Sequence, residues 1–387
     1  MKRFLFVLSL CVSCTLVYAQ DSNSELLKKL VEKNVLTQSE ADSIQGHSIH
    51  SEDKNSLPQT IGKIREAFNT PYMRFGGYGL FMYKYNDLAP VKHNFEGRVI
   101  FLSMRGEITP NLKYFILTEV INPRLHEFWG EWTPANEFNL RLGQMKTPLS
   151  LENQMSLTDI EGIFNTRSVS ALIGMTDDVQ RLQNGKNNTG RDVGIMAYGN
   201  LFKTQTHDLL EYKVGLYQGT GLNTSENNNS KDFAANLTLQ PVKGFRIGGG
   251  VYFGEAKYLK PEYMNSDDTE ESNHVRNRWI VSSDYRSERV YARAEWIKAN
   301  DGGISKEGLH GMGLYYFIPQ KLNAFAKVDY LNQNKNTNNE VIDYTLGINY
   351  HFYGPCRFQL NYTYSDYSNS WGERNSNTVL GQMQIVF

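Results

Sequence analysis

The chain of 387 residues carries a formal net charge of -1, which argues against a nucleic-acid partner because such partners require a strong basic excess. No run of about 18 apolar residues follows the N-terminal segment, so no helix is expected to span a bilayer. A mean hydropathy of -0.49 is combined with 12% aromatic residues, which is typical both of membrane barrels with one wet side and of large soluble all-β proteins.

Residues 1–19 have the layout of a secretory signal peptide. A basic start precedes an apolar run over residues 4–17, and Ala19 ends a small-residue cleavage site. An alternative is a lipoprotein acylated at Cys14. Cleavage after Ala19 leaves Cys356 as the only one of the 3 cysteines, so the secreted chain is expected to have no internal disulfide.

Residues 20–70 are expected to form a periplasmic helical hairpin followed by a linker. Two capping boxes, at residues 22–25 and 37–40, each mark the start of a helix, and apolar residues follow the first at helical spacing. Residues 46–70 are polar. A small appendage is one interpretation of the hairpin, and an oligomerising coil is the other.

From Tyr72 onward the apolar residues recur with a period of two. One face of each run is continuously apolar and the other is largely polar, which is typical of transmembrane strands. Runs of this kind occupy residues 72–85, 112–120, 232–240, 245–253, 290–296, 322–330 and 358–364. Counting all such segments predicts an all-β fold, a 16-stranded antiparallel transmembrane barrel over residues 71–387. Closure leaves no unpaired backbone edge in lipid, and 16 strands enclose an aqueous lumen.

The connections between these runs alternate in length. Short turns contain Gly, Pro or Asn and lie near residues 109–111, 133–136, 240–244, 286–288, 318–320 and 353–355. Long polar loops are expected at residues 86–94, 146–190, 219–231, 256–273, 300–309, 332–340 and 366–378. Short periplasmic turns opposite long outer loops are characteristic of outer-membrane barrels.

The longest connection, residues 146–190, lacks any clean periodicity. Structureless loops of this length are uncommon and usually functional, so we expect the segment to fold into the mouth of the barrel as a constriction loop. At the other end of the barrel domain, the final strand alternates up to Phe387. This terminal aromatic residue is expected to be the signal that the barrel-assembly machinery recognises.

The flanks of the long loop resemble the phosphate-selective porin O and P family. The resemblance rests on residues 139–152 (NLRLGQMKTPLSLE), 190–198 (GRDVGIMAY) and 213–221 (KVGLYQGTG), and it extends over nearly the whole mature chain. It implies a homotrimer of 16-stranded barrels, each with a pore constricted by folded-in loops. The helical segment before the barrel resembles that of such porins from Bacteroidetes-like bacteria. Phosphate selectivity does not follow from the resemblance alone.

Anion selection requires fixed positive charge where a pore is narrow. Strand parity places Arg141, Lys213, Arg293 and Lys327 on the lumen side, and Arg98 is expected on the same side. Arg191 directly follows the long loop. Two arginines, Arg141 and Arg191, flank this loop and are the first candidates for a constriction charge. Two observations argue against strong anion binding. Acidic residues share the strand face of Arg293 and Lys327, and the numbers of basic and acidic residues are equal between residues 146 and 191.

The sequence therefore predicts an outer-membrane porin for small hydrophilic solutes and anions, with phosphate selectivity as a narrower alternative. A competing hypothesis is a barrel enzyme of the phospholipase or protease type, which would need a nucleophile and a histidine near the rim. The histidines beyond the linker lack metal-ligand spacing, so neither a metal nor another cofactor is expected. The segment before the barrel is too small for the plug domain of a receptor.

Overall fold

A computed structural model describes residues 69–70, 72–185, 189–259 and 270–387 of the chain. The described residues belong to one compact unit, Phe68–Phe387. The predicted signal peptide and helical hairpin lie outside the described residues. Within the described part, no helix has the length and apolar character needed to cross a bilayer.

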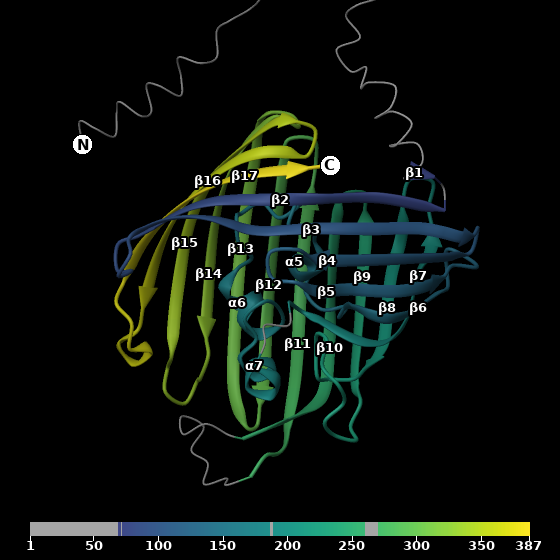
Figure 1. The fold of residues 1–387 in the computed structure, drawn as a ribbon, viewed down its shortest axis with the longest axis horizontal. Helices are drawn as coiled ribbons and strands as arrows, with labels where there is room; N and C mark the ends of the chain where they lie inside the picture. The colour runs from purple at the N-terminus through teal and green to yellow at the C-terminus, as the bar shows by residue number, and fades with distance from the viewer. Residues whose placement is uncertain (1–68, 71, 186–188, 260–269) are drawn as a thin grey trace, which may run out of the picture. The chain divides into compact units, whose positions relative to one another are not determined.

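Sixteen antiparallel strands, β2 to β17, form one continuous sheet among the described residues (Figure 1). Each strand pairs with its sequence neighbours, and β17 pairs with β2, so the sheet closes into a barrel. The two-residue strand β1 (Asn69–Thr70) pairs with the start of β2. The barrel strands are β2 (Met73–Asn86), β3 (His93–Thr109), β4 (Leu112–Glu119), β5 (Arg124–Trp132), β6 (Asn139–Lys146), β7 (Arg191–Lys203), β8 (Asp208–Tyr217), β9 (Asp232–Val242), β10 (Phe245–Tyr258), β11 (Ser272–Arg286), β12 (Val290–Asp301), β13 (Ile304–Ile318), β14 (Leu322–Asn332), β15 (Glu340–Tyr353), β16 (Cys356–Tyr367) and β17 (Ser376–Val386). The predicted fold class and strand number are confirmed.

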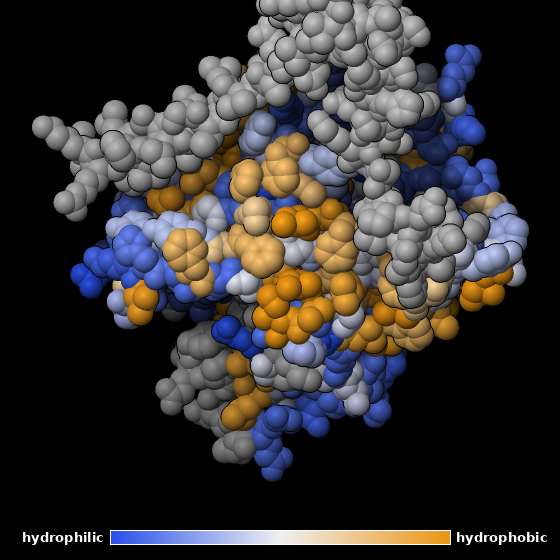
Figure 2. Space-filling model, turned by 45° about the horizontal axis from the view of Figure 1, so that its top comes forward, coloured by the Kyte–Doolittle hydropathy of each residue, from blue (hydrophilic) through white to orange (hydrophobic). Residues whose placement is uncertain are grey.

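The two faces of the wall differ as the period-two pattern predicts. On β15, Leu346 and Ile348 are 60% and 52% exposed, whereas Asn349 on the opposite face is fully buried. The same outward row of large apolar residues continues through neighbouring strands, and Figure 2 shows hydrophobic side chains gathered across the wall. Such a surface is stable in lipid, where the closed ladder satisfies every backbone polar group.

One predicted loop is wrong. The polar stretch 300–309 does not form a long loop, because β12 continues to Asp301 and β13 begins at Ile304. Gly302 and Gly303 both have positive φ, at 57° and 93°, which favours a tight hairpin turn. The polar residues that suggested a loop are strand residues with partners: the Lys306 ammonium lies 3.0 Å from the Asp301 carboxylate.

The segment between β6 and β7 contains three short helices, α5 (Leu151–Gln154), α6 (Arg167–Leu172) and α7 (Asp178–Asn184) (Figure 1). We call residues 147–190 the inner loop. Many of its apolar side chains belong to one cluster with inward-facing residues of β6 to β12, β14 and β15. This cluster includes Leu149, Val169, Leu172 and Ile173 of the loop and Ile280, Ile297, Leu331 and Val341 of the wall. The loop therefore packs inside the barrel because the wall offers it an apolar surface to bury.

Candidate permeation site

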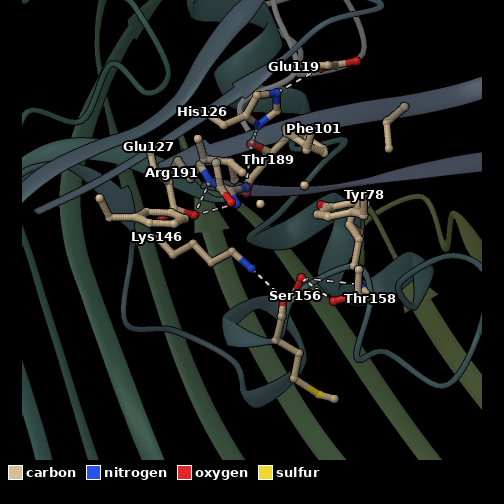
Figure 3. Close-up of a pocket in the computed structure, with 18 of the residues that line it drawn as sticks. Tyr78, Phe101, Glu119, His126, Glu127, Lys146, Ser156, Thr158, Thr189 and Arg191 are labelled. Carbon is tan, nitrogen blue, oxygen red and sulfur yellow. Dashed lines mark hydrogen bonds and ion pairs between the residues drawn. The ribbon is translucent and has the colours of Figure 1, made fainter. Parts of the chain in front are cut away.

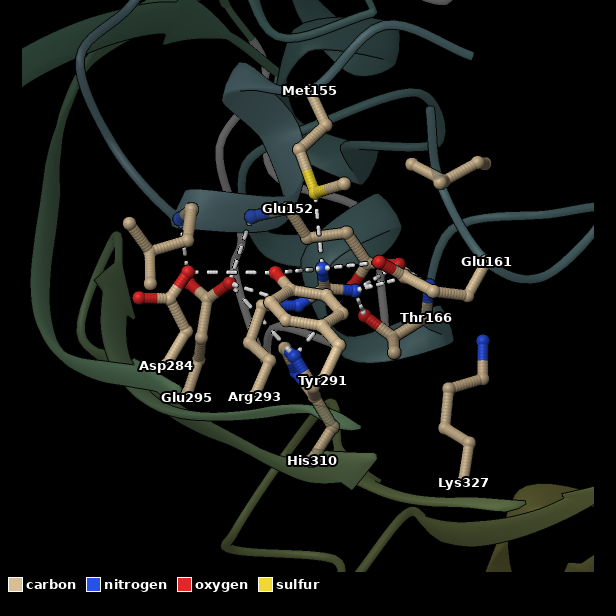
Figure 4. A network of polar contacts seen from close by, with 12 residues as sticks. Glu152, Met155, Glu161, Thr166, Asp284, Tyr291, Arg293, Glu295, His310 and Lys327 are labelled. Carbon is tan, nitrogen blue, oxygen red and sulfur yellow. Dashed lines mark hydrogen bonds and ion pairs between the residues drawn. The ribbon is translucent and has the colours of Figure 1, made fainter. Parts of the chain in front are cut away.

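The inner loop is fastened to the barrel wall first through α5. The Glu295 carboxylate on β12 accepts hydrogen bonds from the backbone N–H groups of Leu151 (3.0 Å) and Glu152 (2.8 Å) (Figure 4). These are two of the N–H groups that a helix N-terminus leaves without an internal partner. The Glu152 carboxylate in turn accepts from the backbone N–H and the hydroxyl of Thr166, which ties the two ends of this part of the loop together.

Arg293 is the central cation of this anchor. Its guanidinium lies 3.0 Å from the Glu161 carboxylate and 3.7 Å from that of Glu152, and its side chain is 1% exposed. Burial raises the pKa of the Glu152 carboxyl, but Arg293 and Lys327 outweigh this effect and hold the pKa at about 2. The positive charge of Arg293 is therefore neutralised by loop carboxylates.

Two further anchors lie along the loop. The Arg167 guanidinium of α6 donates to both Asp343 oxygens, at 2.8 and 3.1 Å, while the Asp329 carboxylate accepts from the backbone N–H of Ser168. At the start of α7, the Asp177 carboxylate lies 2.7 Å from the guanidinium of Arg276 on β11. The wall residues of all three anchors belong to strands between β11 and β15.

Removal of the central cation should detach the loop. We expect Arg293→Met to cost about 3–5 kcal/mol of loop attachment, because Glu152 and Glu161 would remain buried without their partner. Cleavage of the inner loop by proteinase K in detergent, followed on gels, would measure this. Lys335→Met is the matched control, since Lys335 and Glu307 form an exposed ion pair whose loss should leave the cleavage of the inner loop unchanged. Equal protease resistance of both variants would contradict this role of Arg293.

An open cavity of about 780 Å³ remains on the opposite side of the inner loop (Figure 3). The inward faces of β2 to β6 supply one wall, and loop residues such as Met155, Leu157 and Phe164 supply the other. Among the described residues, seven basic side chains line it and only two carboxylates, Glu119 and Glu127, do so. The basic residues are Arg74, Arg98, Arg105, Arg124, Arg141, Lys146 and Arg191.

Several of these cations are held in place by neighbours. The Arg191 guanidinium lies 2.7 Å from the Glu127 carboxylate. Arg141 pairs with Glu131 across β5 and β6, and its guanidinium lies 3.9 Å from the Trp129 ring centroid. The Lys146 ammonium donates to the backbone carbonyl of Met155 at 2.5 Å. These contacts fix the position of the charges at the cavity wall.

Three cations of the cavity lack such a carboxylate. Within the described part of the chain, no carboxylate forms an ion pair with Arg74, Arg98 or Arg105. Arg74 and Arg105 are exposed and directly opposite each other on β2 and β3, an arrangement in which the two like charges repel each other. An anion between these two side chains would relieve that repulsion.

Arg98 reaches the cavity through a β-bulge. On β3, Gly97 pairs with Phe81 and Val99 pairs with Leu80, so Arg98 is the extra residue that has no partner on β2. A bulge re-aims a side chain in this way. The Arg98 guanidinium donates to the Ile163 carbonyl of the inner loop at 2.6 Å and lies 4.1 Å from the Phe164 ring centroid.

The six residues singled out from the sequence lie in three places. Arg98, Arg141 and Arg191 line the cavity. Arg293 and Lys327 lie under the inner loop, where the Lys327 ammonium is 3.4 Å from the Phe164 carbonyl. Lys213 pairs with Glu211 at 2.7 Å and does not line the cavity.

Sequence reasoning missed four cations of the cavity: Arg74, Arg105, Arg124 and Lys146. The parity of β2 and β3 could have identified Arg74 and Arg105 as inward-facing residues. Parity cannot identify which inward residues remain uncovered by the loop, since that depends on where the loop docks. Lys146 lies at the end of β6, where the alternation stops, so parity does not place its side chain.

One arrangement in the wall resembles the layout of a hydrolase site. The His126 Nε2 atom lies 3.0 Å from the Glu119 carboxylate, and its Nδ1 atom lies 3.5 Å from the Thr189 hydroxyl (Figure 3). The Thr189 hydroxyl, however, accepts a hydrogen bond from Arg191, and the residue is only 5% exposed. A buried hydroxyl with this partner is not presented to a substrate, so the arrangement fixes Arg191 instead.

A closed 16-stranded barrel with an apolar outer surface, an inner loop and a polar cavity defines an outer-membrane porin. The match to a family model covers residues 77–387, and its description is phosphate-selective porin O and P. The chain belongs to this family of non-enzymatic channels of the Gram-negative outer membrane, which excludes the barrel-enzyme alternative.

Solved structures of porins share the fold at low sequence identity. OmpT of Vibrio cholerae in its trimer form is 12% identical with a TM-score of 0.57, and 81% of this chain and 99% of that chain are covered. OmpF of Salmonella typhi in complex with daunomycin is 13% identical with a TM-score of 0.58, covering 81% and 97%. The channel DcaP of Acinetobacter baumannii is 12% identical with a TM-score of 0.52, also covering 81% and 97%. None of the curated proteins matches the sequence.

Proposed function

We propose that this porin is a general anion-preferring diffusion channel whose selectivity arises in the cavity between the inner loop and β2 to β6. The excess of basic over acidic side chains around that cavity carries the proposal. Fixed positive charge in a narrow, poorly screened passage raises the local concentration of anions and lowers that of cations. Arg98, Arg141 and Arg191 are the constriction charges, joined by Arg74 and Arg105.

Phosphate is one of the anions that would pass, together with other small hydrophilic solutes. A strictly phosphate-selective channel would need several cations free to bind one anion in place. Of the three constriction charges, Arg141 and Arg191 are each paired with a carboxylate. Arg74 and Arg105 have no ion pair with a described carboxylate, but they are exposed, and both observations favour general anion preference. Arg293, Lys327 and Lys213 act in this proposal as wall charges outside the constriction.

The assembly proposed for the chain is a homotrimer surrounded by outer-membrane lipids. Membership of the porin family and the trimer form of OmpT support it. Phe387 is proposed as the residue that the barrel-assembly machinery contacts. The residue is 66% exposed, while its backbone N–H and carbonyl pair with Gly77 and so fix it to β2.

Reversal potentials across a KCl gradient in planar bilayers test the proposed preference. We expect a potential of the sign that chloride permeation produces, and a smaller one for Arg141→Ala, because this change removes a cavity cation and leaves the Glu131 charge. The potential of Lys213→Ala should change less, although Lys213 is also paired with a glutamate on the lumen side. A cation-selective potential of the unaltered protein would refute the proposed function, and equal effects of the two variants would remove the cavity as the source of selectivity.

A further inference from the structure

The lumen side of β2, β3 and β4 carries an apolar cluster where a water-filled barrel usually has polar residues. We call this surface, together with the loop residue that covers it, the apolar wall. Its buried members are Leu80, Val99, Phe101 and Leu117, and Tyr78, Phe115 and Leu157 pack against them. The members of the cluster face the cavity or the inner loop, so they are not part of the surface that contacts lipid.

Part of the apolar wall is open to the cavity. Tyr78, Phe115 and Leu157 are half-buried and line the cavity, and Phe164 of the inner loop, which is 40% exposed, lines it from the other side. The ring of Tyr78 lies 5.2 Å from that of Phe101, so a supported aromatic surface stands behind the opening. A solute in the cavity therefore meets aromatic and aliphatic side chains as well as charge.

The cations surround the same space. Figure 3 shows Tyr78 on one side and Lys146 and Arg191 on the other, with Ser156 of the inner loop between them. The Arg98 guanidinium lies over the Phe164 ring, which joins a charged and an apolar contact at one place. The cavity thus combines an apolar side with a cationic side within a volume typical of small-molecule sites.

We propose that this cavity is a binding site for organic anions that carry an aromatic ring. The ring packs against Tyr78, Phe115 and Leu157, and the anionic group faces Arg98, Lys146 and Arg191. Burial of apolar surface favours such a solute, whereas an inorganic anion of the same charge gains nothing from the apolar wall. This inference rests on the proposed anion-preferring channel and names the solute class that the channel retains longest.

Block of the chloride current by benzoate and by acetate tests the proposal. Both are monoanions at neutral pH and differ by the ring, so charge alone predicts equal block. We expect half-block of single-channel current at a benzoate concentration about tenfold lower than that of acetate, a ratio equivalent to about 1.4 kcal/mol. Inorganic phosphate provides a third probe, for which the apolar wall predicts no advantage over acetate.

Two variants from different elements locate the site. Leu157→Asn alters the loop side of the apolar wall, and Phe115→Thr alters the strand side with a residue suited to a strand. Each should reduce the ratio of acetate to benzoate half-block concentrations toward one. Leu182→Asn is the matched control, since Leu182 is 39% exposed on α7 and does not line the cavity, and it should keep the full ratio.

The outcomes separate this inference from the proposed function. Equal block by benzoate and acetate, with an anion-selective reversal potential, overturns the aromatic site and leaves the anion channel intact. Strong benzoate block that survives in both wall variants places the binding elsewhere and also overturns it. A cation-selective potential overturns the channel proposal and the inference together. Selective benzoate block that either wall variant weakens, while Leu182→Asn retains it, supports the site.

Discussion

Deletion of most of residues 155–185 is expected to raise the single-channel conductance about two- to threefold, because the inner loop packs inside the lumen and borders the cavity of about 780 Å³. Steps of current in planar bilayers, recorded in KCl with purified protein, would measure the change. The barrel itself should still form, since every wall strand pairs with its neighbours independently of the loop.

The matched control is a deletion of residues 336–338, three exposed residues of the connection between β14 and β15. Because they do not line the cavity, conductance should be unchanged. If the inner-loop deletion also left conductance unchanged, the loop could not be the constriction of this pore. Protein that fails to form the barrel would be degraded by protease, and its mobility on gels would not change on heating. These two measurements distinguish a misfolded variant from an unaltered pore.

Combined replacement of Arg74, Arg98 and Arg105 by glutamine should abolish most of the anion preference. These three cations of the cavity are not in ion pairs with described carboxylates, so they contribute net positive charge rather than half of a neutral pair. Removing them leaves mainly cations that are paired with Glu119, Glu127 or Glu131. We expect the reversal potential in a KCl gradient to approach zero.

The comparison for this triple variant is Arg246→Gln combined with Lys231→Gln and Lys335→Gln, which removes the same number of charges away from the cavity. The reversal potential of that variant should stay near its original value. Equal loss in both triple variants would show that total charge, and not the cavity lining, sets selectivity.

The barrel could be predicted from the sequence because lipid imposes a local rule. Residues that face lipid must be apolar, and closure of the sheet must satisfy each backbone polar group. The alternation of apolar and polar residues along each strand therefore predicts the barrel. The same rule failed at residues 300–309, where both faces are polar. Lys306 and Asp301 pair inside the barrel, and polarity there reflects an ion pair rather than a loop.

The candidate site could be predicted only in part. Parity separates inward from outward residues, and on this basis Arg141 and Arg293 look equivalent. They differ because the inner loop covers Arg293 and not Arg141, through pairs such as Arg293 and Glu161, which are 132 positions apart. Nothing in a local pattern encodes such a pairing. The position of Arg98 likewise depends on a bulge that only the register of β2 and β3 reveals.

The placement of the ion pairs that anchor the inner loop has a consequence for how such channels can diversify. The ion pairs that anchor the loop come from β11, β12 and β15, whereas the charges and rings that a solute meets come largely from β2 to β6. Substitutions on one half can therefore retune which solutes are favoured without releasing the element that sets the bore. Solute preference and pore width can thus be adjusted separately, because they depend on different strands of the same barrel.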